Sequence, residues 1–160
     1  MKSLQIRPLN KGDHALVAPF LEEHWGSTKQ VSRGRIHHAD DLPGFIAMQA
    51  DSPVGLMTYR INGNECEIVT LNSIVEEVGI GTALLDAVKD VAADAECKRL
   101  WLITTKENMV ALHFYQKRGF LLVAVYPNAV EQSRRLKPEI PLVGIDGIPL
   151  RDEIELELLL

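Results

Sequence analysis

The chain has 160 residues, 46% of them hydrophobic and 24% charged, and its 17 Lys and Arg against 22 Asp and Glu give a formal net charge of −5. This length favours one globular domain whose core needs no disulfide or metal, and the acidic balance counts against a nucleic-acid binder. Cys66 and Cys97 have no metal-site or redox-motif spacing, so we expect reduced core thiols. The polar start and the lack of an apolar run of about 20 residues predict no signal peptide and no membrane span, hence a cytoplasmic protein.

The first half of the chain predicts an antiparallel meander. Asp13 is expected to cap a helix that ends at Gly26, and the polar segment 27–43 is expected to hold a short helix and loops. The turn Asn62-Gly63-Asn64 predicts a hairpin, because Asn and Gly tolerate positive φ. Strands are predicted at 4–8, 45–49, 54–61 and 65–71.

The pattern then changes to alternating helices and strands. Apolar residues at helical spacing predict a helix over 81–96. The run 100–104 is apolar on both faces, as in a central strand, and should pair in parallel with the strand before the helix through a right-handed crossover. A second helix should begin after Asn108 and end before Gly119, and a strand should follow at 121–126.

The end of the chain combines a long connection with a clear strand. Residues 127–150 contain four prolines and a predicted helix at 129–136, and after them Ile, Leu and Glu alternate over 153–160 as in a half-buried strand. A connection this long inside one domain is uncommon and tends to be functional. Its charges predict either a solvated face or a segment that folds over a substrate cleft or forms a homodimer contact.

A glycine turn precedes the first long helix. Gly79 and Gly81 would direct backbone N–H groups outward at a helix N-terminus, which attracts phosphate; a plain tight turn would have the same residues. A dinucleotide-binding turn needs a third glycine where Leu84 stands and an acidic residue where Thr104-Thr105 stand. A P-loop needs Gly-Lys-Ser/Thr, and the sequence has no such tripeptide.

Two motifs resemble those of the GNAT acetyltransferase family. The first is the Gly79-Ile80-Gly81-Thr82 turn between a strand and a helix, and the second contains Asn108, Ala111, Phe114, Tyr115, Gly119 and Phe120 at the family's spacing. The resemblance covers about 1–126 and the final strand. It implies one N-acetyltransferase domain over 1–160, an α/β fold with a mixed, mostly antiparallel twisted sheet flanked by helices.

The resemblance also implies a reaction, the transfer of acetyl from acetyl-CoA to a primary amine of a small molecule or protein. The alternative is a GNAT-like domain that binds CoA without turnover, as a sensor or interaction module. A nucleotide-dependent oxidoreductase is disfavoured by the missing glycine and acidic residue. Neither a metal nor a nucleic-acid or membrane partner is expected.

The expected cofactor contacts follow from the same resemblance. The strand that ends near 71–73 would pair its backbone with the pantetheine arm, and its N–H groups would polarise the thioester carbonyl. The glycine turn would hold the phosphates. Asn108 would bind the pantetheine or simply cap its helix. The expected cofactor-binding residues are Val69, Leu71, Asn72, Ser73, Val78, Gly79, Ile80, Gly81, Thr82, Asn108, Ala111 and Phe114.

Two residues are catalytic candidates. Tyr115 would donate a proton to the leaving thiolate, or it would be a core aromatic residue. Glu67 is expected to act as general base on the strand beside the thioester, and its alternative role is a solvent-facing charge. Deprotonating an amine of pKa ~10.4 at neutral pH costs roughly 4 kcal/mol, so a base should matter more than an acid.

One position departs from the family pattern. Glu76 stands where the family has a basic or amide residue, and Glu77 follows it. Two carboxylates repel a pyrophosphate, so we expect them to point to solvent while Lys117 or Arg118 supplies positive charge.

The histidines have a simpler interpretation. His37 and His38 are adjacent and should point apart, so with Asp40 and Asp41 they are expected to form a solvated or substrate-contacting loop rather than a metal site. His24 ends the first helix, where the acceptor cleft of the family begins, and packing is the simpler interpretation there.

Overall fold

The computed structural model describes residues 4–73 and 79–160 and contains one seven-stranded sheet in the order β1-β4-β5-β6-β7-β9-β8. Every neighbouring pair in it is antiparallel except β6 and β7. The predicted mixed, mostly antiparallel sheet is confirmed. Its strands are β1 (Leu4–Pro8), β4 (Gly44–Gln49), β5 (Ser52–Asn62), β6 (Glu65–Ser73), β7 (Arg99–Thr105), β8 (Leu121–Tyr126) and β9 (Glu153–Leu159).

Helices cover both faces of the sheet. One face packs on α2 (Ile80–Asp94) and α3 (Met109–Lys117), and this larger core also buries Cys66 and Cys97 as free thiols. The other face packs on α1 (His14–Trp25) through Phe20, Leu21 and Ile46. The helices predicted before Gly26, over 81–96 and between Asn108 and Gly119 are therefore present, with ends that differ by up to two residues. Among the described residues, no helix is long and apolar enough to cross a membrane.

The segment 27–43 differs from its prediction. It forms a two-stranded hairpin, β2 (Lys29–Ser32) and β3 (Arg35–His38), followed by a single turn of 3₁₀ helix at Ala39–Asp41. The hairpin turns at Arg33 and Gly34, which have φ of 49° and 73°. Two-residue hairpins of type I′ need positive φ at both central positions, where Asn-Gly is the usual signal. Because arginine stands at the first of these positions, the sequence does not predict this turn.

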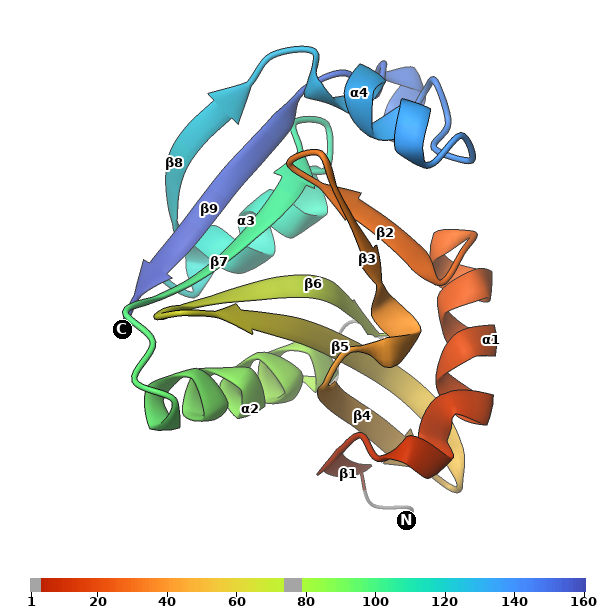
Figure 1. The fold of residues 1–160 in the computed structure, drawn as a ribbon, viewed down its shortest axis with the longest axis vertical. Coiled ribbons are helices and arrows are strands. Elements are labelled where there is room, and N and C mark those ends of the chain that lie inside the picture. Colours follow the sequence, from red (N-terminus) through yellow and green to blue (C-terminus); the bar gives the residue numbers. More distant parts are fainter. Residues whose placement is uncertain (1–3, 74–78) are drawn as a thin grey trace.

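The tail is held by one arginine. Helix α4 (Ala129–Leu136) lies where it is predicted, and Arg134 on it donates to the carbonyl oxygens of Ile140, Pro141 and Leu150 at 2.9–3.2 Å. These bonds fold the connection back onto α4. Figure 1 shows α4 and the tail beside the β2–β3 hairpin, at the open side of the sheet.

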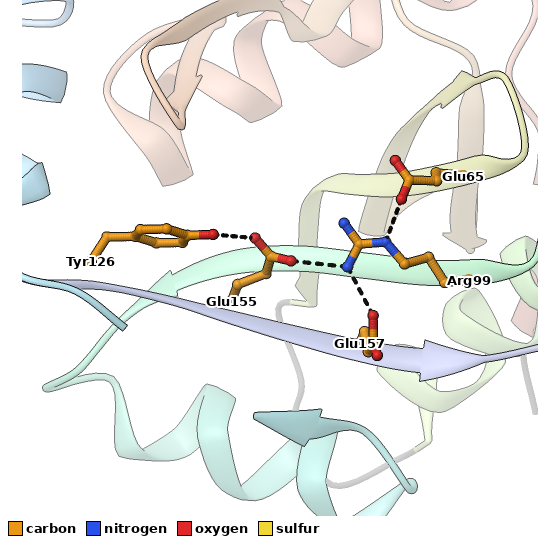
Figure 2. Close-up of polar contacts among 5 residues, drawn as sticks. All are labelled: Glu65, Arg99, Tyr126, Glu155 and Glu157. Atoms are coloured by element: carbon orange, nitrogen blue, oxygen red, sulfur yellow. Dashed lines mark hydrogen bonds and ion pairs between the residues drawn. The ribbon is translucent and has the colours of Figure 1, made fainter. Parts of the chain in front are cut away.

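Strand β9 corrects the expectation of a half-buried strand. Its glutamates are largely covered: Glu153 is 4% exposed, and the side chains of Glu155 and Glu157 are 12% and 18% exposed, whereas Leu159 at the end of the strand is 67% exposed. Alternating charged residues suggested a solvent face, but here they face Arg99 of β7. Its guanidinium donates to both Glu155 and Glu157 at 2.9 Å (Figure 2).

The Arg99 side chain joins three strands. Besides its bonds to β9, it donates to Glu65 of β6 at 2.7 Å, and Tyr126 of β8 donates to Glu155 at 2.8 Å (Figure 2). Three carboxylates around one guanidinium stabilise its charge and raise the pKa of Arg99, against an opposing effect of burial. The group closes the end of the sheet where β6 and β7 are paired.

Beyond that end, β6 and β7 separate. Their parallel register covers only Glu65 with Arg99, Cys66 with Leu100 and Glu67 with Trp101. Strand β6 then continues to Ser73 while pairing with β5, and β7 continues to Thr105 while pairing with β9. Figure 1 shows the two halves of the sheet turning away from each other. Among the described residues, the β7 side of β6 from 68 to 73 has no strand partner.

The start of α1 is fixed by an ion pair rather than by the expected cap. Asp13 makes no capping bond to α1 and instead receives two 2.8 Å bonds from the guanidinium of Arg7 on β1. Its Oδ2 also accepts from the N–H of Asn10 at 2.8 Å. The bonds from Arg7, followed by the Asn10 bond, hold the pKa of Asp13 at about 2, against the opposing effect of burial.

This ion pair gives a pH-dependent stability. The carboxyl pKa is lower in the folded protein than its ordinary value of 3.8, so the pair stabilises fully above about pH 4 and loses its effect as the pH falls toward 2. Asp13→Asn should lower the free energy of unfolding by about 1–2 kcal/mol at pH 7. Urea unfolding of both proteins at pH 7 and pH 3 measures this, and a difference that is larger at pH 3 would contradict it.

Candidate active site

A cleft of about 520 Å³ lies beside the diverging strands. Its walls are the end of α1, the β2–β3 hairpin, β6, β7, α4 and the tail. We call it the Glu67 cleft, after the buried carboxylate at the point where β6 and β7 separate. The tail therefore folds over a cleft, as one of the two sequence interpretations expected. Its polar lining includes His24, Gln30, Ser32, His37, Glu67, Asn108, Ser133, Lys137, Glu139 and Glu153.

The β2–β3 hairpin brings two side chains to Glu67. Ser32 donates its hydroxyl proton to Glu67 Oε2 at 2.7 Å, and its oxygen lies 2.9 Å from His37 Nε2. A hydroxyl has one proton, so His37 must be the donor in the second bond, as the tautomer protonated at Nε2. The result is a directed chain from His37 through Ser32 to Glu67.

Burial shifts the pKa values of the two titratable groups in this hydrogen-bonded series. Glu67 and His37 are each 4% exposed. Burial raises the pKa of Glu67, while the Ser32 bond and the charges of Arg60 and Arg35 partly offset this. Burial, aided by the same two arginines, lowers the pKa of His37 to about 4. His37 is therefore neutral at pH 7, and its 3.8 Å approach to Glu67 Oε1 is not an ion pair.

These findings decide two expectations about the hairpin. Glu67 is not a solvent-facing charge, so that alternative is wrong. His37 is buried and His38 is exposed, so the two rings point apart as expected.

The glycine turn lies at the start of α2, although Val78, Glu76 and Glu77 fall outside the described residues. Gly79 has φ of 78°, which favours glycine, and a Cβ on Gly81 would lie 3.2 Å from the Phe114 ring. The small residue thus lets α2 and α3 approach closely. Ile80 is buried in the core, and Thr82 lies in the first turn of the helix.

Arg118 is the cation beside this helix start. Its guanidinium donates to Thr82 Oγ1 at 2.6 and 3.1 Å and to the Phe114 carbonyl at 2.9 Å, with its carbon 3.8 Å from the centre of the Phe114 ring. Lys117, the other candidate, is exposed. The position of Arg118 favours it as the residue that supplies positive charge at α2.

Asn108 caps its helix, as one of its two interpretations expects, while its contact with pantetheine stays a prediction. Its Oδ1 accepts from the N–H of Ala111 at 3.1 Å, which caps α3, and the residue also lines the Glu67 cleft. Val69 of β6 lines the cleft too. Leu71 packs against the core, and Asn72 and Ser73 pair with β5.

Tyr115 is a core residue. It is 7% exposed and packs edge-on against Phe114 and Phe120, with ring centres 5.1 and 5.2 Å apart. Burial raises the pKa of its hydroxyl, so it is protonated at neutral pH. The packing interpretation is correct, and its role as proton donor stays a prediction.

Sequence reasoning did not assign several residues of the cleft to the site, among them Ser32, Ser133, Lys137 and Glu153. Ser32 lay in a segment expected to be a helix and loops, while Ser133 and Lys137 lay in a connection whose default interpretation was a solvated face. Glu153 was assigned to a half-buried strand. The available signal was the spacing of Val130 and Ser133 on one face of the predicted 129–136 helix, with Lys137 directly after its end.

Comparison with known proteins places this geometry in context. The model of the acetyltransferase (GNAT) family matches residues 13–120. The Bacillus subtilis (strain 168) protein YdhI, itself uncharacterized, is 47% identical over 150 residues, which are 93% of this chain and 94% of that protein.

Two solved structures share the fold. An IAA acetyltransferase from Bacillus cereus ATCC 14579 has a TM-score of 0.78 at 22% identity and covers 99% of this chain and 100% of its own. A GNAT family acetyltransferase from Elizabethkingia anophelis with acetyl-CoA bound has a TM-score of 0.72 at 19% identity, over 98% of each chain.

The buried histidine yields a prediction about acid stability. In the unfolded chain His37 takes a proton near pH 6.5, whereas in the folded protein it does so only near pH 4. The folded protein is therefore stabilised above about pH 6.5, by up to about 3 kcal/mol relative to acid conditions, and this is lost as the pH falls toward 4. His37→Gln should show a weaker loss of stability over this range. NMR titration of the His37 ring checks the cause, and a midpoint above pH 6 would contradict it.

Proposed function

Because the chain belongs to the acetyltransferase (GNAT) family, we propose that it transfers the acetyl group of acetyl-CoA to a primary amine of a small molecule or protein. The observation that carries the proposal is the buried Glu67 carboxylate at the point where β6 and β7 separate, facing a cleft. A structural neighbour that binds acetyl-CoA supports the choice of donor.

The described residues fit such a donor. The β7 side of β6 offers backbone groups from Val69 to Ser73 to an extended pantetheine arm, as an added strand would use them. The start of α2 offers N–H groups and a helix dipole to the phosphates, with Arg118 beside them. Asn108 lies at the edge of the cleft and offers an amide group to the arm. Acetyl-CoA would supply the reactive thioester.

Glu67 is proposed as the general base. The acceptor reaches the cleft as an ammonium ion, and its nitrogen attacks only after losing a proton, at a cost of roughly 4 kcal/mol for a pKa near 10.4. A carboxylate with a raised pKa is a stronger base than an exposed one, and Ser32 holds its orientation through the bond to Oε2. Glu67 thus takes one proton from the ammonium group, and the free amine attacks the thioester carbonyl, so that the C–N bond forms as the C–S bond breaks and CoA leaves as the thiolate. Tyr115 is proposed to protonate this thiolate, and the second proton that the nitrogen loses on becoming an amide passes to solvent, from which Tyr115 is protonated again.

The alternative is a CoA-binding domain without turnover. The sequence feature that favours it is the pair Glu76 and Glu77, whose carboxylates would repel the pyrophosphate of CoA. Both residues lie outside the described residues. Thiol release measured over a panel of amines separates the two functions. Release with any amine supports the enzyme, while tight acetyl-CoA binding without release on the whole panel supports the binding module.

The role of Glu67 predicts a pH-dependent defect. Glu67→Gln should lower kcat about 10²- to 10⁴-fold at neutral pH. The defect should grow as the pH falls, so long as Glu67 stays ionised in the wild type, because the variant depends on amine that has already lost its proton. Glu65→Gln is the control, since this carboxylate lies on the same strand and contacts Arg99 instead. Wild-type and Glu67→Gln pH–rate profiles of the same shape and height would remove Glu67 from the mechanism.

The position of Arg118 predicts a contribution to cofactor affinity. Arg118→Met keeps much of the packing on Phe114 but removes the charge, and it should weaken acetyl-CoA binding about tenfold, more at low salt than at high salt. Lys117→Met, at the exposed neighbouring position, should have little effect. Titration calorimetry of both variants at two salt concentrations decides the matter. Equal effects of the two substitutions would show that Arg118 has no specific role.

A further inference from the structure

The Glu67 cleft contains a second buried carboxylate that the proposed reaction does not use. Glu153 at the start of β9 is 4% exposed and lines the cleft. Its Oε2 accepts a hydrogen bond from Ser133 of α4 at 2.7 Å, whereas its Oε1 is buried and has no hydrogen-bond partner among residues 4–73 and 79–160. Leaving a buried carboxylate oxygen without a hydrogen bond costs free energy, so such an atom in a cleft indicates a ligand that donates a hydrogen bond to it.

The nearby cations of the described residues contact other groups and do not donate a hydrogen bond to Glu153 Oε1. Lys106 and Arg151 contact its neighbour Asp152, at 3.8 and 3.2 Å. Lys137, the C-cap residue of α4, donates instead to the Trp25 carbonyl and to Gln30 Oε1, at 3.1 and 3.4 Å. The positive charge must then come from the ligand.

We propose that Glu153 binds a second cationic group of the acceptor, so that the acceptor carries an ammonium or guanidinium in addition to the amine that is acetylated. This proposal rests on the proposed function. Glu67 selects the reacting amine at one end of the cleft, and Glu153 holds the distal cation at the other. The tail, through α4, thus determines which amines are accepted.

The sheet register gives the separation of the two carboxylates. Glu67 is level with Trp101 of β7, and Glu153 is opposite Thr105 of the same strand. Four residues of β strand place the two levels roughly 13 Å apart along β7. An acceptor that contacts both carboxylates is therefore extended, with several methylene groups between its two cations.

Lys137 suggests the competing specificity. It is a buried ammonium in the same cleft, 5% exposed, and it would attract a carboxylate on the acceptor. The Lys137 ammonium already donates hydrogen bonds to two oxygen atoms of the protein, whereas Glu153 Oε1 accepts none from the described residues. The observations thus favour a dicationic acceptor over an amino acid.

Three amines of equal length test this choice: hexylamine, 1,6-diaminohexane and 6-aminohexanoate. The expected order of kcat/KM places the diamine about 10- to 100-fold above hexylamine, the ratio expected of one hydrogen bond to a buried charge. Equal values for the diamine and hexylamine would overturn the proposal. The highest value for 6-aminohexanoate would also overturn it and would assign recognition to Lys137.

Variants connect the preference to Glu153. Glu153→Gln should lower the diamine-to-hexylamine ratio about 10- to 100-fold, and Glu157→Gln, on the same face of β9 but bonded to Arg99, should leave the ratio unchanged. Ser133→Ala retains the carboxylate and should retain the preference. A ratio that falls as far in Ser133→Ala as in Glu153→Gln would show that the pair is structural. Melting temperatures of all three variants establish that each is folded.

Binding separates this inference from the proposed function. Calorimetry with 1,6-diaminohexane and the CoA-loaded wild type and Glu153→Gln proteins needs no turnover. Diamine binding that weakens about 10- to 100-fold in the variant supports the cation site even if no amine is acetylated. Acetylation of hexylamine with no diamine preference and no effect of Glu153→Gln on binding would refute the cation site and leave the acetyltransferase intact.

Discussion

The pairing of β6 with β7 ends after three residues, and the site depends on that ending. Up to Glu67 the strands form a continuous sheet; beyond it, β6 follows β5 and β7 follows β9. Arg99 holds the closed end, because its guanidinium bonds to carboxylates on β6 and β9 while its own backbone lies between them on β7 (Figure 2). The open end leaves backbone groups of β6 without a strand partner and exposes one side of Glu67 to the cleft.

One face of these strands is unusually acidic, and its carboxylates are used in two ways. At the closed end, Glu65, Glu155 and Glu157 share Arg99 and are stabilising neighbours of a single cation. At the open end, the hydrogen bonds that Glu67 and Glu153 accept from the described residues come from hydroxyl groups, those of Ser32 and Ser133.

The sequence predicts the frame of the fold better than the walls of the cleft. Periodicity places α2 and the central strand, and Asn108 and Gly119 bound α3 as expected, because these signals are local. The β2–β3 hairpin is not predicted, since Arg33 occupies a position of positive φ that normally signals itself through Asn or Gly. Glu153 is misjudged for another reason: alternation gives the face of a strand but not what covers it, and α4 covers it from 20 residues earlier in the chain.

The central claim is that the donor lies in the gap between β6 and β7, with its phosphates at the start of α2. Hydrogen–deuterium exchange of the protein with and without acetyl-CoA measures this directly, peptide by peptide. The account predicts slower exchange in peptides covering 69–73 and 79–82 when acetyl-CoA is bound, with no change in β1 or β4. Binding that protects neither of these two segments would contradict it.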